Sequence, residues 1–555
     1  MIPLFAQGTV TDLPAPFEIP DIAWSALTPL LVLAVGGLLL LTFSSLIPAL
    51  QKSSMALTIY TVAISIGAIG TTIPLWNRVQ RVCDQGEVCQ AGPFSTAATA
   101  WGVDGFSLFL TVLLAASVGL SALLVHDYLQ RENLVGPEPY VLLMLSASGG
   151  VVMASANDLI VVFIGLEILS IAVYVLAGMH LLRLASQEAA IKYLVLGAFA
   201  SAFFLYGIAL VYGATGSTSL IGIQGFLASN VLTSSGTLLA GIAMLLVGFS
   251  FKIAAVPFHF WTPDVYQGAP SPIVAYMASG VKVAGFAGLI RVFALAFTDY
   301  SADDWRPFML VLAILTMAVG ALLAIVQTDV KRTLAYSSIS HAGFIMVGVH
   351  SASDVGVSAA LFYLGAYTFI VAGSFGVITL VGRRGDNLHE LSDYHGLSRR
   401  RPMLAVVFTV FLLAQAGVPL TSGFFAKFYV IRSAVDSEDY GLAVVAMITA
   451  VIGAFLYLRI IVAMFMSDPL DELASHGHEI DADGNPVVLD DAAVAERKAA
   501  REEIEAGEGP AIRVPVMAGV SIGIALVVTV VVGFLPGVMS GFANDALPSL
   551  IAAGG

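Results

Sequence analysis

Charged side chains are scarce in this sequence. Asp, Glu, Lys and Arg make up 11% of its 555 residues, whereas about 25% is typical of soluble domains. Apolar residues reach 58%, and the mean hydropathy is +0.91. A chain with so few charges cannot cover an ordinary water-exposed surface, so the composition predicts an integral membrane protein. The net charge of −14 arises mostly from loops, and we expect no nucleic-acid partner.

Cysteine is nearly absent as well. Cys83 and Cys89 are the two cysteines of the sequence, too few to hold an iron–sulfur cluster or a cysteine-based zinc site within the chain. We therefore expect no metal site here, and any redox centre must lie in another protein. Both cysteines fall in the loop 77–104, where they could form a disulfide if the loop faces an oxidising compartment. The alternative is two unpaired thiols.

Basic residues are missing from the first twenty positions, which instead contain four prolines. A cleaved signal peptide needs a basic start, so residues 1–28 are interpreted as an extended lead outside the cytoplasm.

Long apolar runs occupy most of what remains. A membrane-spanning helix needs about 20 apolar residues, and the loops between the runs are short. The pattern predicts an all-α integral membrane protein with about fourteen transmembrane helices in one bundle. The runs are 29–50, 55–76, 105–125, 140–156, 158–182, 188–213, 237–262, 272–297, 307–327, 333–349, 357–382, 402–431, 441–466 and 513–541.

The basic residues of the loops indicate the orientation. If the N-terminus is outside, most of them fall on the cytoplasmic side, as the positive-inside rule requires. Both termini are then extracytoplasmic. The loops assigned to the inside carry Lys52, Arg131, Arg183, Lys331, Arg332, Arg383, Arg384, Arg399, Arg400, Arg401, Arg497, Lys498 and Arg501.

One long polar segment, 467–512, interrupts this regular pattern. It is acidic and rich in alanine, and it is assigned to the cytoplasmic side. It is interpreted as a solvated excursion from the membrane, with docking onto a neighbouring protein as the alternative.

Ionisable residues inside the apolar runs are the candidate functional residues. Each costs at least ~2.5–3.5 kcal/mol at the bilayer centre. Glu167 lies about nine residues into its run, while Lys252, Lys282 and His341 are similarly deep. Two interpretations stay open: the charges form a path for ions, or they form static pairs and helix-packing contacts.

Prolines interrupt two of the runs beside a lysine. Pro257 follows Lys252, and Pro419 precedes Lys427. A proline removes a backbone donor and breaks a helix, and transporters place ion sites at such breaks. The breaks are five crossings apart, which suggests two inverted five-helix repeats, each with a broken helix. The predicted organisation is three N-terminal transmembrane helices (29–128), the first repeat (140–297), the second repeat (307–466), the insertion (467–512) and a C-terminal transmembrane helix (513–541).

Three other residues have two plausible interpretations. Lys192 lies only a few residues inside its run, so it could extend to the membrane surface or belong to the path. His259 and His341 could be path residues or ordinary buried histidines.

Three blocks of the sequence carry a family resemblance. The block FKIAAVPFHFWTPDVYQGAPSPIVAYMASGVKVAGFAGLIR (251–291) resembles the diagnostic block of the antiporter-like subunits shared by respiratory complex I and the Mrp-type cation/proton antiporters. DVKRTLAYSSISHAGF (329–344) and GVPLTSGFFAKFY (417–429) are similar to the second-half blocks of that family. The resemblance spans roughly residues 100–466, and KVAGFAGLIR is closer to the N-type subunit than to the L or M types.

The resemblance assigns roles to the buried residues. It implies that Glu167 is the partner of Lys252, that Lys282 connects the two halves, and that Lys427 ends the path. His259 and His341 would lie on the same axis, with Lys192 as an auxiliary residue.

The resemblance also implies the function. It predicts a proton-translocating membrane-arm subunit of a bacterial NADH:quinone oxidoreductase in the plasma membrane, without a redox cofactor of its own. FMN, iron–sulfur clusters and quinone are expected in other subunits, and M-, K- and J-type subunits are the expected neighbours. The alternatives are a subunit of an Mrp-type Na+/H+ antiporter and a non-transporting scaffold.

Overall fold

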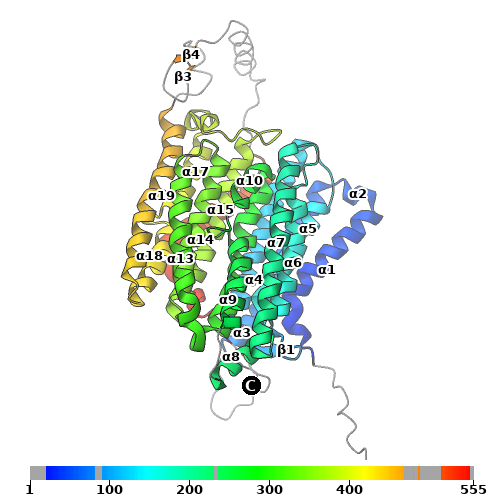
Figure 1. Ribbon diagram of the computed structural model, residues 1–555. Helices are drawn as coiled ribbons and strands as arrows, with labels where there is room; N and C mark the ends of the chain where they lie inside the picture. Colours follow the sequence, from blue (N-terminus) through cyan, green and yellow to red (C-terminus); the bar gives the residue numbers. More distant parts are fainter. Residues whose placement is uncertain are drawn as a thin grey trace, which may run out of the picture.

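The computed structural model describes residues 21–81, 91–230, 236–467, 479–480, 486–487 and 514–549. Cys83, Cys89, residues 1–20 of the predicted lead and most of the predicted insertion 467–512 lie outside the described residues. The described part is a bundle of helices that run roughly parallel to one long axis (Figure 1).

Twelve of these helices are long and apolar enough to cross a membrane. The helix α14 (Val330–His350) and the consecutive pair α17 (Pro402–Ala416) and α18 (Ser422–Asp436) bring the number of crossings in the described residues to fourteen. The all-α prediction of about fourteen transmembrane helices is confirmed. The twelve are α1 (Trp24–Leu46), α3 (Ser54–Val79), α4 (Gly105–Glu132), α5 (Glu138–Ser155), α6 (Leu159–Ala177), α7 (Leu184–Thr215), α9 (Gly236–Ile253), the continuous helix from α11 to η2 (Ser271–Ala296), α13 (Thr298–Ile325), α15 (Asp354–Val381), α19 (Tyr440–Met466) and α22 (Val516–Phe534).

Short elements join these helices. Two antiparallel hairpins, β1 with β2 and β3 with β4, are the strand pairs of the described chain. The continuous helix from α11 to η2 contains two π-helical stretches, η1 and η2. The bounds are α2 (Pro48–Gln51), β1 (Phe94–Thr96), β2 (Trp101–Val103), α8 (Leu220–Ser229), α10 (Trp261–Gly268), α11 (Ser271–Tyr276), η1 (Met277–Val281), α12 (Lys282–Arg291), η2 (Val292–Ala296), η3 (Leu391–Tyr394), α16 (Leu397–Arg400), β3 (Glu479–Ile480), β4 (Pro486–Val487) and α23 (Pro536–Asn544).

The helices that carry buried charges lie at the centre of the bundle. The helix from α11 to η2 is completely buried along its apolar window, and α15 is almost as enclosed. In α1, α3 and α7 only a third of the corresponding window is buried. These outer helices expose isoleucine, leucine and phenylalanine side chains, which fits contact with lipid or with neighbouring membrane subunits.

Both helices in which the sequence places a break are interrupted. The chain leaves helical geometry between Ile253 at the end of α9 and Trp261 at the start of α10, and Pro257 lies in this gap. The second gap runs from Ala416 to Ser422 around Pro419. Gly417, in this second gap, has a φ of +87°, a conformation that a residue with a Cβ adopts only with strain.

Two matching sets of backbone hydrogen bonds support the inverted repeat. At the start of α6, the Leu159 N–H donates to the Thr218 carbonyl (2.9 Å), and the Leu220 N–H donates to the Asn157 carbonyl (2.8 Å). Each of these four positions has a counterpart 171 residues later, at the start of α14. There the bonds run from Val330 to His389 (2.7 Å) and from Leu391 to Thr328 (2.8 Å).

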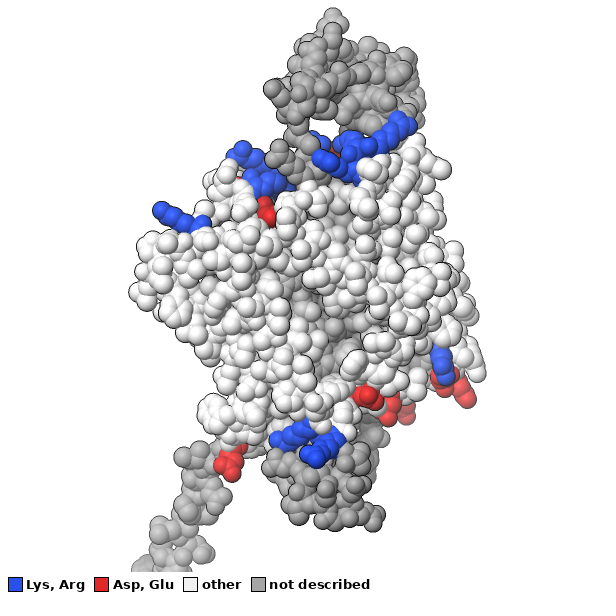
Figure 2. Space-filling view, turned by 180° about the vertical axis from the view of Figure 1, so that it is seen from behind, with Lys and Arg blue, Asp and Glu red and all other residues white. Residues whose placement is uncertain are grey.

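These two sets lie at opposite ends of the bundle, because an odd number of crossings separates them. The start of α14 lies at the same end of the bundle as the loop after α4, the loop between α6 and α7, and the loop after α15. Figure 2 shows Lys and Arg side chains gathered at its upper end, and acidic and basic side chains together at its lower end. The end that carries the loop after α4 is called the basic end below.

Candidate functional site

Glu167 lies in the middle of α6. The carboxylate of Asp158 accepts a hydrogen bond from the Ile160 N–H and caps this helix. Eight residues into the helix, Glu167 is half-buried and faces α7, where the Ser201 hydroxyl donates to its Oε1 atom. The carboxylate therefore lies between α6 and α7.

Lys252 is the last residue but one of α9, immediately before the first break. Its side chain is buried, and its Nζ atom donates to the Ser170 hydroxyl of α6 at 2.8 Å. The rings of Tyr174 and Tyr193 lie 5.7 and 5.5 Å from Nζ, within cation–π range. In the described residues no ion pair of 4.0 Å or less joins Lys252 to Glu167, so Ser170 occupies the position that the sequence assigns to a direct Glu–Lys contact.

Lys282 follows the π-helical stretch η1 in the centre of the bundle. π-helical turns are rare and often mark functional positions. The Lys282 ammonium donates to both the carbonyl and the hydroxyl of Ser338 on α14, the latter at 2.7 Å. The Tyr367 ring lies 5.5 Å away. Lys282 thus joins the last helix of the first repeat to α14 of the second.

His341 lies one helical turn beyond Ser338 on α14. Its Nδ1 atom is 2.6 Å from the Tyr363 hydroxyl, and its Nε2 atom is 3.0 Å from the Tyr457 hydroxyl. Tyr457 is in turn 2.6 Å from the Ser337 hydroxyl. Each ring nitrogen of His341 therefore has a hydroxyl that can donate or accept a proton.

Lys427 lies in α18, just after the second break. It donates to the Ala416 carbonyl at 2.9 Å, a group that has lost its helical partner because α17 ends there. The Phe344 ring lies 5.1 Å from the Lys427 ammonium. Lys427 is buried, so the break supplies the only hydrogen-bond acceptor that it has in the described part of the chain.

One face of α14 connects these groups. Ser338, His341 and Phe344 are spaced at intervals of three residues, which places them on the same side of a helix. They contact Lys282, the two tyrosines and Lys427 in turn. The structure thus brings together Lys282, His341 and Lys427 in one row.

Four predicted residues lie outside this row: Glu167 and Lys252, which bind Ser201 and Ser170, and His259 and Lys192. His259 lies buried within the first break, and its Nδ1 atom has no hydrogen-bond partner among the described residues. No described hydrogen bond joins it to Lys252. Lys192 is 41% exposed and forms ion pairs with Glu188 (2.7 Å) and Asp264 (2.8 Å).

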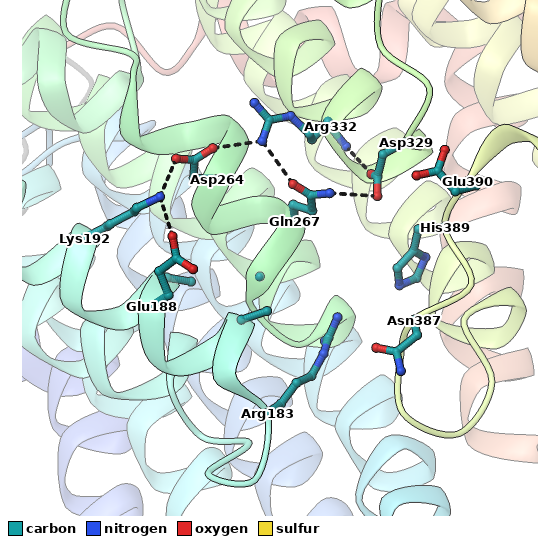
Figure 3. A pocket seen from close by; sticks show the side chains of 13 residues that line it. Arg183, Glu188, Lys192, Asp264, Gln267, Asp329, Arg332, Asn387, His389 and Glu390 are labelled. Atoms are coloured by element: carbon teal, nitrogen blue, oxygen red, sulfur yellow. Dashed lines mark hydrogen bonds and ion pairs between the residues drawn. The ribbon is translucent and has the colours of Figure 1, made fainter. Parts of the chain in front are cut away.

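Lys192 borders a polar cavity of about 450 Å³ at the basic end of the bundle (Figure 3). Arg332 of α14 reaches Asp264 at 2.9 Å, so Asp264 bridges the two repeats across the cavity. The full lining is Arg183, Ala185, Glu188, Ala189, Lys192, Asp264, Gln267, Gly268, Asp329, Arg332, Asn387, His389 and Glu390.

A buried carboxylate, Asp386, holds the loop beside this cavity. Its oxygens lie 3.2 Å from Arg183, 3.4 Å from Lys331 and 3.0 Å from His389, and they accept hydrogen bonds from Ser271. Burial favours the neutral acid, but the Lys331 ammonium, the hydrogen bond from His389 and the Arg183 guanidinium together hold the pKa of Asp386 well below its usual range. The loop carboxylate is therefore ionised and fixes the two repeats to each other.

A second cavity of about 370 Å³ lies at the opposite end of the bundle. It is bordered by the start of α15 and by α18, as the first cavity is bordered by the start of α7 and by α10. Arg183 in the first cavity and Asp354 in the second are 171 positions apart, the separation found for the repeat bonds. The lining is Asp354, Val355, Ser358, Ala359, Phe362, Tyr429, Arg432, Ser540, Asn544 and Leu547.

Several hydroxyls at the site were missed by the sequence analysis, namely those of Ser170, Ser201, Ser338, Tyr363 and Tyr457. Serine and threonine hydroxyls are common in apolar helices, where they donate a hydrogen bond to the backbone carbonyl one turn back. Their presence in an apolar run therefore does not indicate a site. Only Ser338 carried a usable signal, because it lies in the block 329–344 together with His341.

Two broken helices beside buried lysines, within a bundle of fourteen crossings, define the class as an antiporter-like membrane protein. The model of the NADH:quinone oxidoreductase/Mrp antiporter transmembrane family matches residues 156–453. The chain belongs to this family.

Named relatives narrow the resemblance. The chain is 38% identical over 449 residues to NADH-quinone oxidoreductase subunit N of Trichlorobacter lovleyi, covering 81% of this chain and 88% of the relative. It is 41% identical over 507 residues to NADH-quinone oxidoreductase subunit N 3 of Streptomyces griseus, covering 84% and 89%. The predicted resemblance to N-type subunits is confirmed.

Solved structures agree at the level of the fold. A chain of respiratory complex I from Thermus thermophilus superimposes with a TM-score of 0.71 at 29% identity, covering 95% of this chain and all of that one. A chain of the Mrp complex from a Dietzia species gives a TM-score of 0.75 at 20% identity, covering 95% and 97%. The second likeness concerns the fold alone.

Proposed function

We propose that this chain translocates protons as an N-type subunit in the membrane arm of a bacterial NADH:quinone oxidoreductase. The observation that carries the proposal is the row of Lys282, His341 and Lys427 along α14, with a polar cavity at one end of the bundle and a second cavity at the other. A static scaffold has no need for three buried ionisable groups along one helix, because each costs several kcal/mol to bury.

The path begins at the cytoplasmic cavity, where Lys192 and Asp264 exchange with water. A stack of aromatic rings separates this cavity from Lys252, with the Tyr193 and Trp261 rings 4.3 Å apart and nearly parallel. From Lys252 the path continues through Lys282, His341 and Lys427 to the outer cavity. The aromatic stack prevents a continuous chain of water from forming between the cytoplasmic cavity and the row of buried lysines.

The energy for each step comes from changes in charge around Lys252. Desolvation disfavours the ammonium form, whereas a nearby carboxylate favours it. The Glu167 carboxylate therefore raises the proton affinity of Lys252 as long as no other cation binds it. When another cation pairs with the carboxylate, the proton affinity of Lys252 falls. Moving one charge against about 180 mV requires roughly 4 kcal/mol, at about 2.3 kcal/mol per 100 mV, which is within the range of interactions between close, buried charges.

The chain works within a larger complex. In this function, FMN, iron–sulfur clusters and quinone are bound by other subunits of the complex and not by this chain. M-, K- and J-type subunits are its neighbours along the exposed outer helices. The protein lies in the bacterial plasma membrane with both termini outside the cytoplasm.

An Mrp-type Na+/H+ antiporter subunit is the second candidate, because the fold of the Dietzia Mrp chain is equally close. The identities of 38% and 41% to N-type relatives favour complex I. Purification of the assembled complex separates the two: flavin and iron–sulfur absorbance that co-purifies with the chain supports complex I, and its absence from an intact assembly supports an antiporter.

Proton pumping driven by NADH oxidation in inverted membrane vesicles tests the proposal. We expect Glu167→Gln and Lys252→Ala each to abolish most pumping in a complex that still assembles on a native gel. Lys52→Ala, which changes an exposed lysine in the loop after α2, is the matched control and should pump normally. Full pumping by an assembled Lys252→Ala complex would reduce these residues to structural charges and the chain to a scaffold.

A further inference from the structure

Glu167 and Lys252 each meet a serine, and the two serines lie on different helices. Ser201 of α7 donates its hydroxyl proton to Glu167, and Lys252 donates to the hydroxyl oxygen of Ser170 on α6 at 2.8 Å. The carboxylate and the ammonium are therefore not in direct contact. A hydrogen-bonded link between them has to pass through the space between Ser170 and Ser201.

A small cavity occupies that space. Ser170, Ser201 and Lys252 all line it, and its volume is about 10 Å³. One water molecule needs roughly 10–15 Å³ and two to four polar partners. The cavity therefore has the size and the polar lining for a single water.

The free valences of the lining groups fit such a water. A serine hydroxyl has one hydrogen and two acceptor lone pairs. Ser201 uses its hydrogen on Glu167, and Ser170 uses its hydrogen on the Leu166 carbonyl. The Ser201 oxygen can still accept a hydrogen bond. The Ser170 oxygen already accepts from Lys252 and is hydrogen-bonded to the Tyr174 hydroxyl, which lines the same cavity. A water in the cavity can therefore donate to Ser201 on one side and to the Ser170–Tyr174 pair on the other.

Lys252 supplies the third bond. An ammonium has three N–H donors, and Lys252 uses one of them on Ser170 while two tyrosine rings lie beside it. A further N–H can donate to the oxygen of the same water. The water then has three hydrogen bonds, which is the usual number for a buried water.

We propose that Ser170 and Ser201 are positioning residues that, together with one water between them, join the Glu167 carboxylate to the Lys252 ammonium. This inference rests on the proposed function, and it replaces the direct ion pair with a hydrogen-bonded bridge. Loss of the negative charge on Glu167 reorients Ser201 and the water, and the ammonium form of Lys252 loses support. The serines thereby transmit the state of Glu167 to Lys252.

Removal of either hydroxyl tests the bridge in the full complex. We expect Ser170→Ala and Ser201→Ala each to lower NADH-driven proton pumping roughly tenfold, because each removes a hydrogen bond to a charged group. Ser201→Thr keeps the hydroxyl and should restore at least half of the wild-type rate. Ser148→Ala is the matched control, since the Ser148 hydroxyl is also buried in a helix and, among the described residues, bonds to the Met144 carbonyl one turn back and to no charged group.

Two further measurements address the water itself. Ala200 lines the same cavity and is buried, so Ala200→Val leaves both hydroxyls in place but fills the space, and it should also lower pumping about tenfold. A density map of the intact complex should show an ordered water within hydrogen-bonding distance of both Ser170 and Ser201. Native gels establish assembly for every variant.

The outcomes separate this inference from the proposed function. The bridge is overturned if the alanine variants and Ala200→Val pump normally while Glu167→Gln does not, and the proposed function then stands. Failure of Ser201→Thr to restore pumping also overturns it, since the serine would then matter only for packing. Normal pumping by Glu167→Gln would instead remove the proposed function on which the bridge depends.

Discussion

The two repeats hold their buried lysines in different ways on a common framework. In the first repeat Lys252 precedes the break and binds a hydroxyl and two aromatic rings. In the second repeat Lys427 follows the break and binds the carbonyl that the break has freed. The backbone bonds at the starts of α6 and α14 are nevertheless the same, 171 positions apart.

The difference shows that the framework and the proton groups are separable. A hydroxyl can rotate and can both donate and accept, so the surroundings of Lys252 can respond to a change at Glu167. A backbone carbonyl only accepts and is fixed by the chain. We infer that the first repeat is where the proton affinity is switched, and that the second repeat is a more rigid conduit.

The largest expected effect is a loss of stability on removal of the arginine near the C-terminal end of each repeat. Arg291 at the end of α12 bonds to the Ala156 carbonyl and forms an ion pair of 2.6 Å with Asp104 that is fully buried on both sides. Arg459, seven residues before the end of α19, bonds to the carbonyls of Ile325 (2.7 Å) and Gln327 (3.0 Å).

Arg291→Ala should destabilise the protein by about 3–5 kcal/mol, because it removes the cation from the buried Asp104 carboxylate and leaves it with the backbone N–H groups of Ser107 and Ser549. Arg459→Ala should cost nearer ~1.5 kcal/mol, since it frees only carbonyls in a half-buried place. The amount of assembled complex on native gels and its thermal unfolding measure both. Equal losses of stability from the two variants would show that the two arginines stabilise their repeats to the same extent.

The next effect concerns Lys282, which joins the repeats. Lys282→Ala removes the group that bonds to Ser338 of α14, so proton transfer between Lys252 and His341 should fall at least tenfold. NADH-driven pumping in vesicles measures this, with assembly checked on a native gel. Pumping that survives in an assembled Lys282→Ala complex would mean that each repeat conducts protons independently.

Part of the fold and of the candidate site could be predicted from the sequence. The charges of Glu167, Lys252, Lys282 and Lys427 are predictable because burying an ion in lipid is costly and therefore needs a reason. The breaks at Pro257 and Pro419 are predictable because proline ends a helix. The number of crossings follows from hydropathy alone.

What the sequence could not reveal is which groups touch. Ser170 instead of Glu167 contacts Lys252, because the contact depends on the rotation of α6 relative to α9, and an apolar run carries no strong periodicity to define that rotation. Tyr457 reaches His341 from a helix more than a hundred positions later in the chain. His259 and Lys192 fit the local pattern equally well, yet neither joins the described row.

A smaller effect is expected in the second repeat, at Tyr457. Tyr457→Phe keeps the ring but removes the hydroxyl that bonds to His341 and Ser337. Tyr363 still serves the other nitrogen of His341, so we expect pumping to fall only about three- to tenfold, equivalent to one hydrogen bond of about 1 kcal/mol. Vesicle pumping assays measure it, and Tyr429→Phe, at the outer cavity, gives a comparison at the end of the path.

The smallest effect is expected at the cytoplasmic cavity. Lys192 is 41% exposed, and its partners Glu188 and Asp264 are 64% and 36% exposed, so water screens these ion pairs and each contributes at most about 1 kcal/mol. Lys192→Ala should lower pumping no more than about twofold at low salt, and the difference should shrink further at high salt because the Debye length falls to about 3 Å at 1 M. Pumping rates measured across a salt series test this. A tenfold, salt-independent loss would instead mean that Lys192 carries protons itself, as Lys282, His341 and Lys427 do.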